Sequence, residues 1–134
     1  MADAVTSTTI VDDDRKAVIQ LTNTSDGNGE SAVTKIDVSA LATRKSDGAT
    51  CTGCKLAKVT YTTFGMSVKL LWDATTDTIC LDLNENYSDQ LDFTEFGGIQ
   101  NTSGSGKTGD INLTTTGHAS GDSYVIVLTV IKTF

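Results

Sequence analysis

Hydrophobic and polar residues alternate with a period of two along most of this chain, and no segment of useful length follows the helical period. Such alternation is typical of β-strands that bury one face and expose the other. It predicts about eight strands, at residues 8–11, 16–23, 32–38, 55–64, 66–72, 77–83, 110–116 and 123–134. The last of these segments is apolar on both faces, which predicts a central strand.

The phase of the alternation also predicts which side chains point into the core. In the clearest segment, every second residue from Met66 to Trp72 is apolar. The residues predicted to point inward are Ala17, Ile19, Leu21, Thr34, Ile36, Val38, Ala57, Val59, Tyr61, Met66, Val68, Leu70, Trp72, Ile79, Leu81, Leu83, Ile111 and Leu113.

Turn chemistry separates the predicted strands. The segments 26–29 (DGNG), 73–77 (DATTD) and 117–122 (GHASGD) carry the Gly, Asn and Asp residues that tight turns favour. Residues 82–98 and 99–109 resist the alternation, and long loops in compact domains are often functional. Without an internal repeat or a linker, the pattern predicts one domain, 1–134, that is an antiparallel β-sandwich or jelly roll.

Composition narrows the function. The 134 residues are 38% hydrophobic and 20% charged, with a formal net charge of -7. This acidity argues against nucleic acid and anionic membranes as partners, because both attract clustered Lys and Arg. No apolar run reaches the roughly 20 residues of a membrane helix. The N-terminus also lacks the features of a signal peptide, so we expect synthesis in a cytoplasm.

Three cysteines invite a metal or redox interpretation. Cys51 and Cys54 have the CxxC spacing, and Cys80 and His118 could complete a four-ligand zinc site. A single CxxC pair in a loop is a weak signal, so we interpret it as two reduced thiols in an exposed turn, with no zinc and no disulfide. Cys80 alternates with the predicted core positions Ile79 and Leu81, so its side chain is expected on the opposite face of the sheet. We read His118 as a turn residue, since its neighbours are Gly and Ser.

Residues 104–108 (GSGKT) resemble part of a phosphate-binding loop around Lys107. That motif needs a glycine where Asn101 stands, and a helix afterwards, whereas a strand is predicted here. The segment is therefore expected to be a loop with a solvated lysine and no nucleotide. The acidic residues fit no calcium loop, and we expect solvated charge at Asp12, Asp13, Asp14, Asp82, Glu85, Asp89, Asp92 and Glu95.

No arrangement of catalytic residues can be assigned, so the chain is predicted to be a non-enzymatic protein without a cofactor. Trp72 and Tyr61 fall on apolar strand faces and are expected in the core. Phe93 and Phe96, with Leu91, lie in the irregular segment and are candidates for an exposed contact patch. Residues 1–11 are a candidate extended N-terminal arm that could add to a neighbour's sheet edge. Its apolar contacts would be Val5, Ile10 and Val11.

Five stretches, in this order, resemble a family of small virion structural proteins of tailed bacteriophages, including phages of cyanobacteria and marine bacteria. They are residues 2–7 (ADAVTS), 22–35 (TNTSDGNGESAVTK), 71–77 (LWDATTD), 96–98 (FGG) and 106–111 (GKTGDI). The resemblance is strongest to capsid decoration (cement) proteins. It implies a β-rich homotrimer on the virion surface that binds the major capsid protein, made in the host bacterial cytoplasm. It transfers no catalytic residue.

Two alternatives to a decoration protein remain open. One is a neck, tail or baseplate component of the same particle. The other is a carbohydrate- or receptor-binding module, which would use exposed aromatic residues and loops. An enzyme is the least supported of the readings.

Overall fold

The structure, a computed structural model, describes residues 4–27, 29–117 and 119–134. Within these residues the chain forms nine β-strands and two short 3-10 helices. The strands are β1 (Ala4–Asp12), β2 (Lys16–Thr24), β3 (Val33–Ile36), β4 (Gly53–Phe64), β5 (Ser67–Trp72), β6 (Thr78–Leu83), β7 (Ser88–Asp92), β8 (Ile111–Thr116) and β9 (Ser123–Thr133). The 3-10 helices are η1 (Val38–Ala40) and η2 (Thr94–Phe96).

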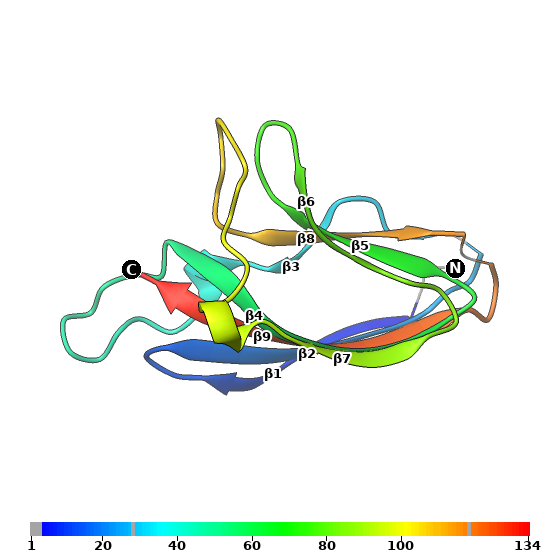
Figure 1. Cartoon of the computed structure of the whole chain (residues 1–134), viewed down its shortest axis with the longest axis horizontal. Helices are drawn as coiled ribbons and strands as arrows, with labels where there is room; N and C mark the ends of the chain where they lie inside the picture. Colours follow the sequence, from blue (N-terminus) through cyan, green and yellow to red (C-terminus); the bar gives the residue numbers. More distant parts are fainter. Residues whose placement is uncertain (1–3, 28, 118) are drawn as a thin grey trace.

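Two antiparallel sheets face one another (Figure 1). The strand order is β1-β2-β9-β4-β7 in one sheet and β3-β8-β5-β6 in the other. Strands β2 to β9 form nested pairs, β2 with β9, β3 with β8, β4 with β7 and β5 with β6. This is the interleaved arrangement of an eight-stranded jelly roll, and β1 adds a ninth strand at one edge. The predicted all-β sandwich is confirmed.

The core lies between the two sheets, where the alternating apolar side chains meet. Trp72 and Tyr124 are among the largest fully buried side chains. Most predicted inward positions are buried, which confirms the phase of the alternation in β2, β4, β5 and β8. The final strand, β9, lies at the centre of the five-stranded sheet, as predicted. Tyr61 and Trp72 are core residues, 4% and 0% exposed.

The prediction for β6 is wrong at its first residues. Between Leu70 and Leu71 the pairing of β5 with β6 shifts by one residue, so that Leu71 lies opposite Ile79 and Leu70 opposite Leu81. A β-bulge of this kind reverses the inside and outside positions. Ile79 is consequently 53% exposed, whereas Cys80 packs against the core.

Three other local predictions differ from the structure. Thr34 was predicted to point inward but is exposed, and the pairing of β3 with β8 shifts by one residue between Thr34 and Ile36. Strand β7 falls in the segment 82–98, which was expected to be irregular, and pairs with β4 from Lys58↔Asp92 to Thr62↔Ser88. Its sequence, SDQLD, holds one apolar residue, and main-chain pairing at a sheet edge needs no alternation. The strand expected at 32–38 ends at Ile36, and the chain turns into η1, capped by the Asp37 side chain. No helix in the described ranges is long and apolar enough to cross a membrane.

A buried carboxylate closes one end of the sandwich. Glu30 forms an ion pair with Lys35, and both side chains are less than a tenth exposed. The Glu30 Oε1 atom also accepts hydrogen bonds from the Tyr124 hydroxyl at 2.5 Å and from Asn23 Nδ2 at 2.7 Å. Its own backbone N–H donates to the Thr115 hydroxyl at 2.9 Å. Side chains from both sheets thus converge on one residue of the β2–β3 connection.

We predict that Glu30→Ala destabilises the fold strongly. Removing one member of a buried ion pair leaves the other charge uncompensated and costs about 3–5 kcal/mol. The free energy of unfolding, from urea titration followed by circular dichroism, measures this loss.

Lys58→Ala is the matched control, because the Lys58–Asp92 pair is 3.8 Å apart and about half exposed. An exposed pair of this kind contributes about 0–1 kcal/mol. Equal shifts of the unfolding midpoint in the two variants would contradict the role assigned to Glu30.

Candidate interaction surfaces

The segment expected to be an N-terminal arm is an edge strand of this chain's own sheet. Strand β1 pairs with β2 from Ala4↔Thr24 to Asp12↔Ala17, with a bulge at Ile10. The turn that joins them is held by the Asp13 carboxylate, which accepts the backbone N–H groups of Arg15 and Lys16 at 2.9 and 2.8 Å. These donors, that of Lys16 most strongly, lower the pKa of Asp13. The described part of the arm therefore does not extend away from the domain.

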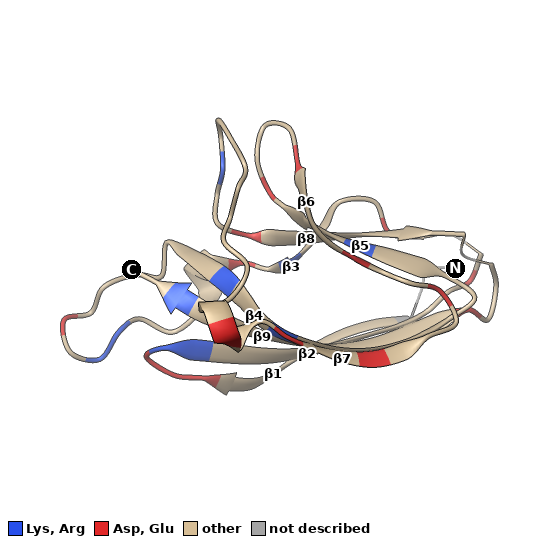
Figure 2. Ribbon diagram, viewed as in Figure 1, with Lys and Arg blue, Asp and Glu red and all other residues tan. Residues whose placement is uncertain are grey.

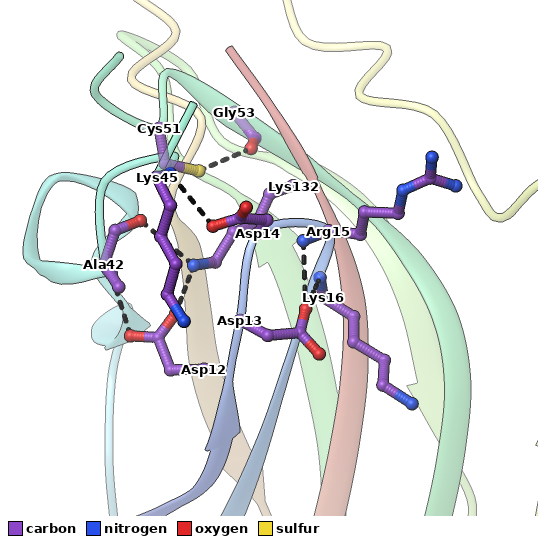
Figure 3. Close-up of polar contacts among 10 residues, drawn as sticks. All are labelled: Asp12, Asp13, Asp14, Arg15, Lys16, Ala42, Lys45, Cys51, Gly53 and Lys132. Carbon is purple, nitrogen blue, oxygen red and sulfur yellow. Dashed lines mark hydrogen bonds and ion pairs between the residues drawn. The ribbon is translucent and has the colours of Figure 1, made fainter. Parts of the chain in front are cut away.

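The acidic residues of this turn hold the chain in place, as Figure 3 shows. Asp12 forms an ion pair with Lys132, whose side chain is fully buried. The other Asp12 oxygen accepts the backbone N–H of Ala42 at 2.8 Å, and Lys132 Nζ donates to the Ala42 carbonyl at 3.1 Å. Asp14 accepts the backbone N–H of Lys45 at 3.0 Å. The expectation of merely solvated charge is wrong for Asp12 and Asp14, because the β9 end and the segment after η1 pack against them.

Strand β1 is an unusually unprotected sheet edge. It is nine residues long, and residues 4–11 contain neither a charge nor a proline. Natural edge strands are commonly short or charged, which prevents another strand from adding to them. The other three edges are shorter, since β3 has four residues, β7 has five with Asp89 and Asp92 among them, and β6 has six with Asp82 among them. Val5 and Ile10 on β1 are 41% and 54% exposed, whereas Val11 is half-buried.

The outer face of the five-stranded sheet is uncharged over its centre. Pairing of β2, β9 and β4 places Thr22 and Thr62 on either side of Val125, which is 42% exposed. The outward residues of the three strands here are Val18, Gln20, Thr22, Thr60, Thr62, Val125, Val127 and Thr129. Lys58, which pairs with Thr129, borders this uncharged region and forms an ion pair with Asp92. Figure 2 shows several Lys and Arg segments at the end of the molecule where the C-terminus lies, and others on β5 and in the loops.

The predicted aromatic contact patch is only partly exposed. Phe96 is 66% exposed. Leu91 and Phe93 are half-buried and pack against the core, so the expected patch is smaller than the sequence indicated. The Phe93 and Phe96 rings lie 6.1 Å apart in a tilted arrangement, so the exposed Phe96 ring packs against the half-buried Phe93 ring.

Both cysteines of the CxxC pair are buried, so the expectation of an exposed turn is wrong. Cys51 and Cys54 are 2% and 4% exposed. The Cys51 thiol donates to the Gly53 carbonyl at 3.1 Å and the Cys54 thiol to the Gly109 carbonyl at 3.5 Å. Burial raises the pKa of Cys54 well above its usual range and raises that of Cys80 to about 12. All three cysteines are free thiols.

The loop with the GSGKT sequence is attached to the β5–β6 turn. The backbone N–H of Thr75 donates to the Ser105 carbonyl at 3.1 Å, and the Thr108 hydroxyl donates to Asp73 at 2.8 Å. Strand β8 follows at Ile111, so the segment is a loop that leads into a strand, as predicted. His118, expected in a turn, lies outside the described residues.

The second acidic cluster is exposed, as predicted, and one member, Asp92, also accepts a hydrogen bond from the Thr94 backbone N–H and forms an ion pair with Lys58. Its members Asp82, Glu85, Asp89, Asp92 and Glu95 are all exposed. They lie on the surface side of β6 and β7 and in the connections next to those strands.

The buried thiols are predicted to react slowly in the native protein. A thiol with a pKa near 12 is ionised to roughly one part in ten thousand at pH 8, and the thiolate is the reactive form. A colorimetric disulfide reagent should therefore label the folded chain orders of magnitude more slowly than the chain in urea. Labelling should accelerate as the pH rises. Three fast-reacting thiols in the folded protein at pH 8 would contradict this burial.

The described part of the chain contains no group of three or more His, Cys, Asp or Glu side chains arranged to hold a metal ion. No family model matches the chain, and no curated protein shows significant similarity to it. The features available for a functional argument are therefore the free edge of β1, the uncharged sheet face and the loops around the buried cysteines.

Proposed function

We propose that this protein is a non-enzymatic virion structural protein, and specifically a decoration protein that stabilises a phage head by binding the major capsid protein. The resemblance of five ordered stretches to tailed-phage structural proteins suggests the class. A jelly roll agrees with it, because this fold occurs in viral capsid domains, although a fold by itself does not decide a function.

The free edge of β1 is the observation that carries the proposal. An extended segment of another protein can pair with such an edge through main-chain hydrogen bonds, which supply affinity without a side-chain pocket. The edge is presented by a rigid body, since the turn beside it is fixed by Asp12, Asp13 and the buried Lys132. In this proposal the edge strand makes the contact that the sequence analysis assigned to an extended N-terminal arm.

The proposed assembly is a homotrimer. Copies with a net charge of -7 repel one another, so they meet best through a surface without carboxylates. The centre of the outer face of the five-stranded sheet is such a surface. Linked subunits then bind a symmetric shell with an avidity greater than that of any single contact, provided that all copies engage together.

A carbohydrate- or receptor-binding module is the second candidate function. Three aromatic side chains are strongly exposed, Phe64 at 63%, Tyr87 at 50% and Phe96 at 66%. Exposed aromatic rings and the occurrence of the jelly roll in lectins favour this alternative. Saturable binding on a glycan array, lost when these rings are replaced by Ala, would select it over the decoration protein.

We predict that the protein covers the outside of the capsid in a copy number that follows the capsid symmetry. Cryo-electron microscopy of the particle, with quantification of the virion proteins, measures both the location and the copy number. Density confined to the neck, tail or baseplate would contradict the assignment as a decoration protein and support the alternative of a neck, tail or baseplate component.

We predict that Ser7→Lys with Thr8→Lys weakens binding to undecorated capsids by about tenfold or more, because lysines on an edge strand oppose the addition of another strand. Both side chains are exposed, on opposite faces of β1, so the fold should be unaffected. Sedimentation with purified capsids measures the bound fraction.

The matched control adds the same two charges away from β1, with Gln90→Lys on the opposite sheet edge and Thr116→Lys at the end of β8. Both positions are exposed. An equal loss of binding in the control variant would exclude the β1 edge as the specific contact.

A further inference from the structure

A surface pocket of about 470 Å³ lies between the start of β4 and the loop at residues 99–109. Thr52 and Lys55 line one side, and Gln100, Asn101 and Lys107 line the other. This volume falls within the range of small-molecule sites. The pocket takes no part in the capsid contact proposed for β1.

The walls of this pocket are formed where the loop at residues 99–109 comes close to β4 at two points. Leu56 and Ile99 exchange backbone hydrogen bonds of 3.1 and 2.8 Å, and these place Gln100 and Asn101 beside β4. Gly109 has a positive φ of 86°, and a Cβ there would lie 2.5 Å from the Thr52 carbonyl. Only glycine lets the loop return so close to β4. The walls are thus fixed by the fold.

The pocket lining includes several side chains that can donate hydrogen bonds. The Asn101 side-chain oxygen accepts the Ser103 backbone N–H at 2.9 Å, and a backbone N–H can only donate. The Asn101 oxygen is therefore committed to Ser103, which leaves the amide nitrogen for a ligand. Gln100, which carries a second side-chain amide, and Lys55 and Lys107, which carry ammonium groups, also line the pocket.

No carboxylate balances the two lysines. The lining contains neither Asp nor Glu. Among the described residues, Lys35, Lys58, Lys132 and Arg44 form ion pairs, whereas no ion pair joins Lys55 or Lys107 to a carboxylate. Two like charges in one pocket repel each other, and a bound anion relieves that repulsion. This arrangement is notable in a chain that carries an excess of seven negative charges.

We propose that this pocket binds an oxyanion, a phosphate or a carboxylate group, between Lys55 and Lys107. The two ammonium groups form charge-assisted hydrogen bonds to the anionic oxygens, and the Asn101 amide donates to a third position. No helix N-terminus contributes, because the loop leads into β8, so the site differs from a nucleotide-binding phosphate loop.

Titration of the isotope-labelled full chain with inorganic phosphate, and separately with glutarate, tests the proposal by nuclear magnetic resonance. Chloride keeps the ionic strength constant and serves as the reference anion. The expected result is a saturable shift of the side-chain amide signals of Asn101 and Gln100 with at least one of the two anions. Preferential binding of phosphate or of glutarate then identifies which oxyanion the pocket favours.

The variant Lys55→Gln with Lys107→Gln should bind about tenfold more weakly or worse, because both charge-assisted bonds are lost. Lys16→Gln with Lys69→Gln is the matched control, since it removes the same charge from exposed sites outside the pocket. Lys107→Gln alone, in an exposed loop, covers the case in which the double variant does not fold. Absence of saturable shifts in the unmodified protein, or an equal loss in the control, would overturn the proposal.

Discussion

The burial of the Glu30 carboxylate is the constraint on which one end of this sandwich depends. Transferring a charge into a protein interior is costly unless it is paired and hydrogen-bonded. Here the cost is offset by Lys35 from β3, by Tyr124 from β9 and by Asn23 from β2. Because these partners come from both sheets, the network forms only when the sheets stand at one separation and in one register. It therefore specifies a single packing where apolar contacts alone would tolerate several.

A second ion pair, with a fully buried Lys132, fixes the packing at the other end of the sandwich. Lys132 closes β9 against Asp12, the last residue of β1, and against the segment that follows η1. The β1 edge that we assign to partner binding is consequently attached to the buried part of the domain through this ion pair. The edge of β1 is held by its pairing with β2 and is fixed at its end by Lys132, so little conformational entropy remains to be lost when another strand adds to it.

The capsid contact proposed for β1 and the oxyanion site proposed beside β4 use different chemistry. Each can bind its partner in spite of the protein's net charge of -7. At β1 the affinity comes from main-chain groups, which are the same for any sequence, and the neutral side chains of the strand do not repel an acidic partner. In the pocket beside β4, by contrast, two lysines without a carboxylate partner and the amide of Asn101 are proposed to bind an anion in spite of the overall negative charge. The local arrangement of groups determines the affinity at each site, while the net charge affects only how a partner approaches from a distance.

The amino-acid sequence by itself determined the all-β class, the place of most strands and the inward faces of β2, β4, β5 and β8, since the period-two alternation is a local property of the chain. It could not place Ile79 or Cys80, because the bulge in β6 reverses the phase without a sequence signal. Nor could it show that Glu30 meets Lys35, that Asp12 meets Lys132, or that residues 4–12 pair with their own sheet. Those outcomes, together with the burial of Cys51 and Cys54 and the pocket between Lys55 and Lys107, depend on which distant strands become neighbours. Only the tertiary structure decided them, because contacts between remote segments are set by packing and pairing of the whole chain.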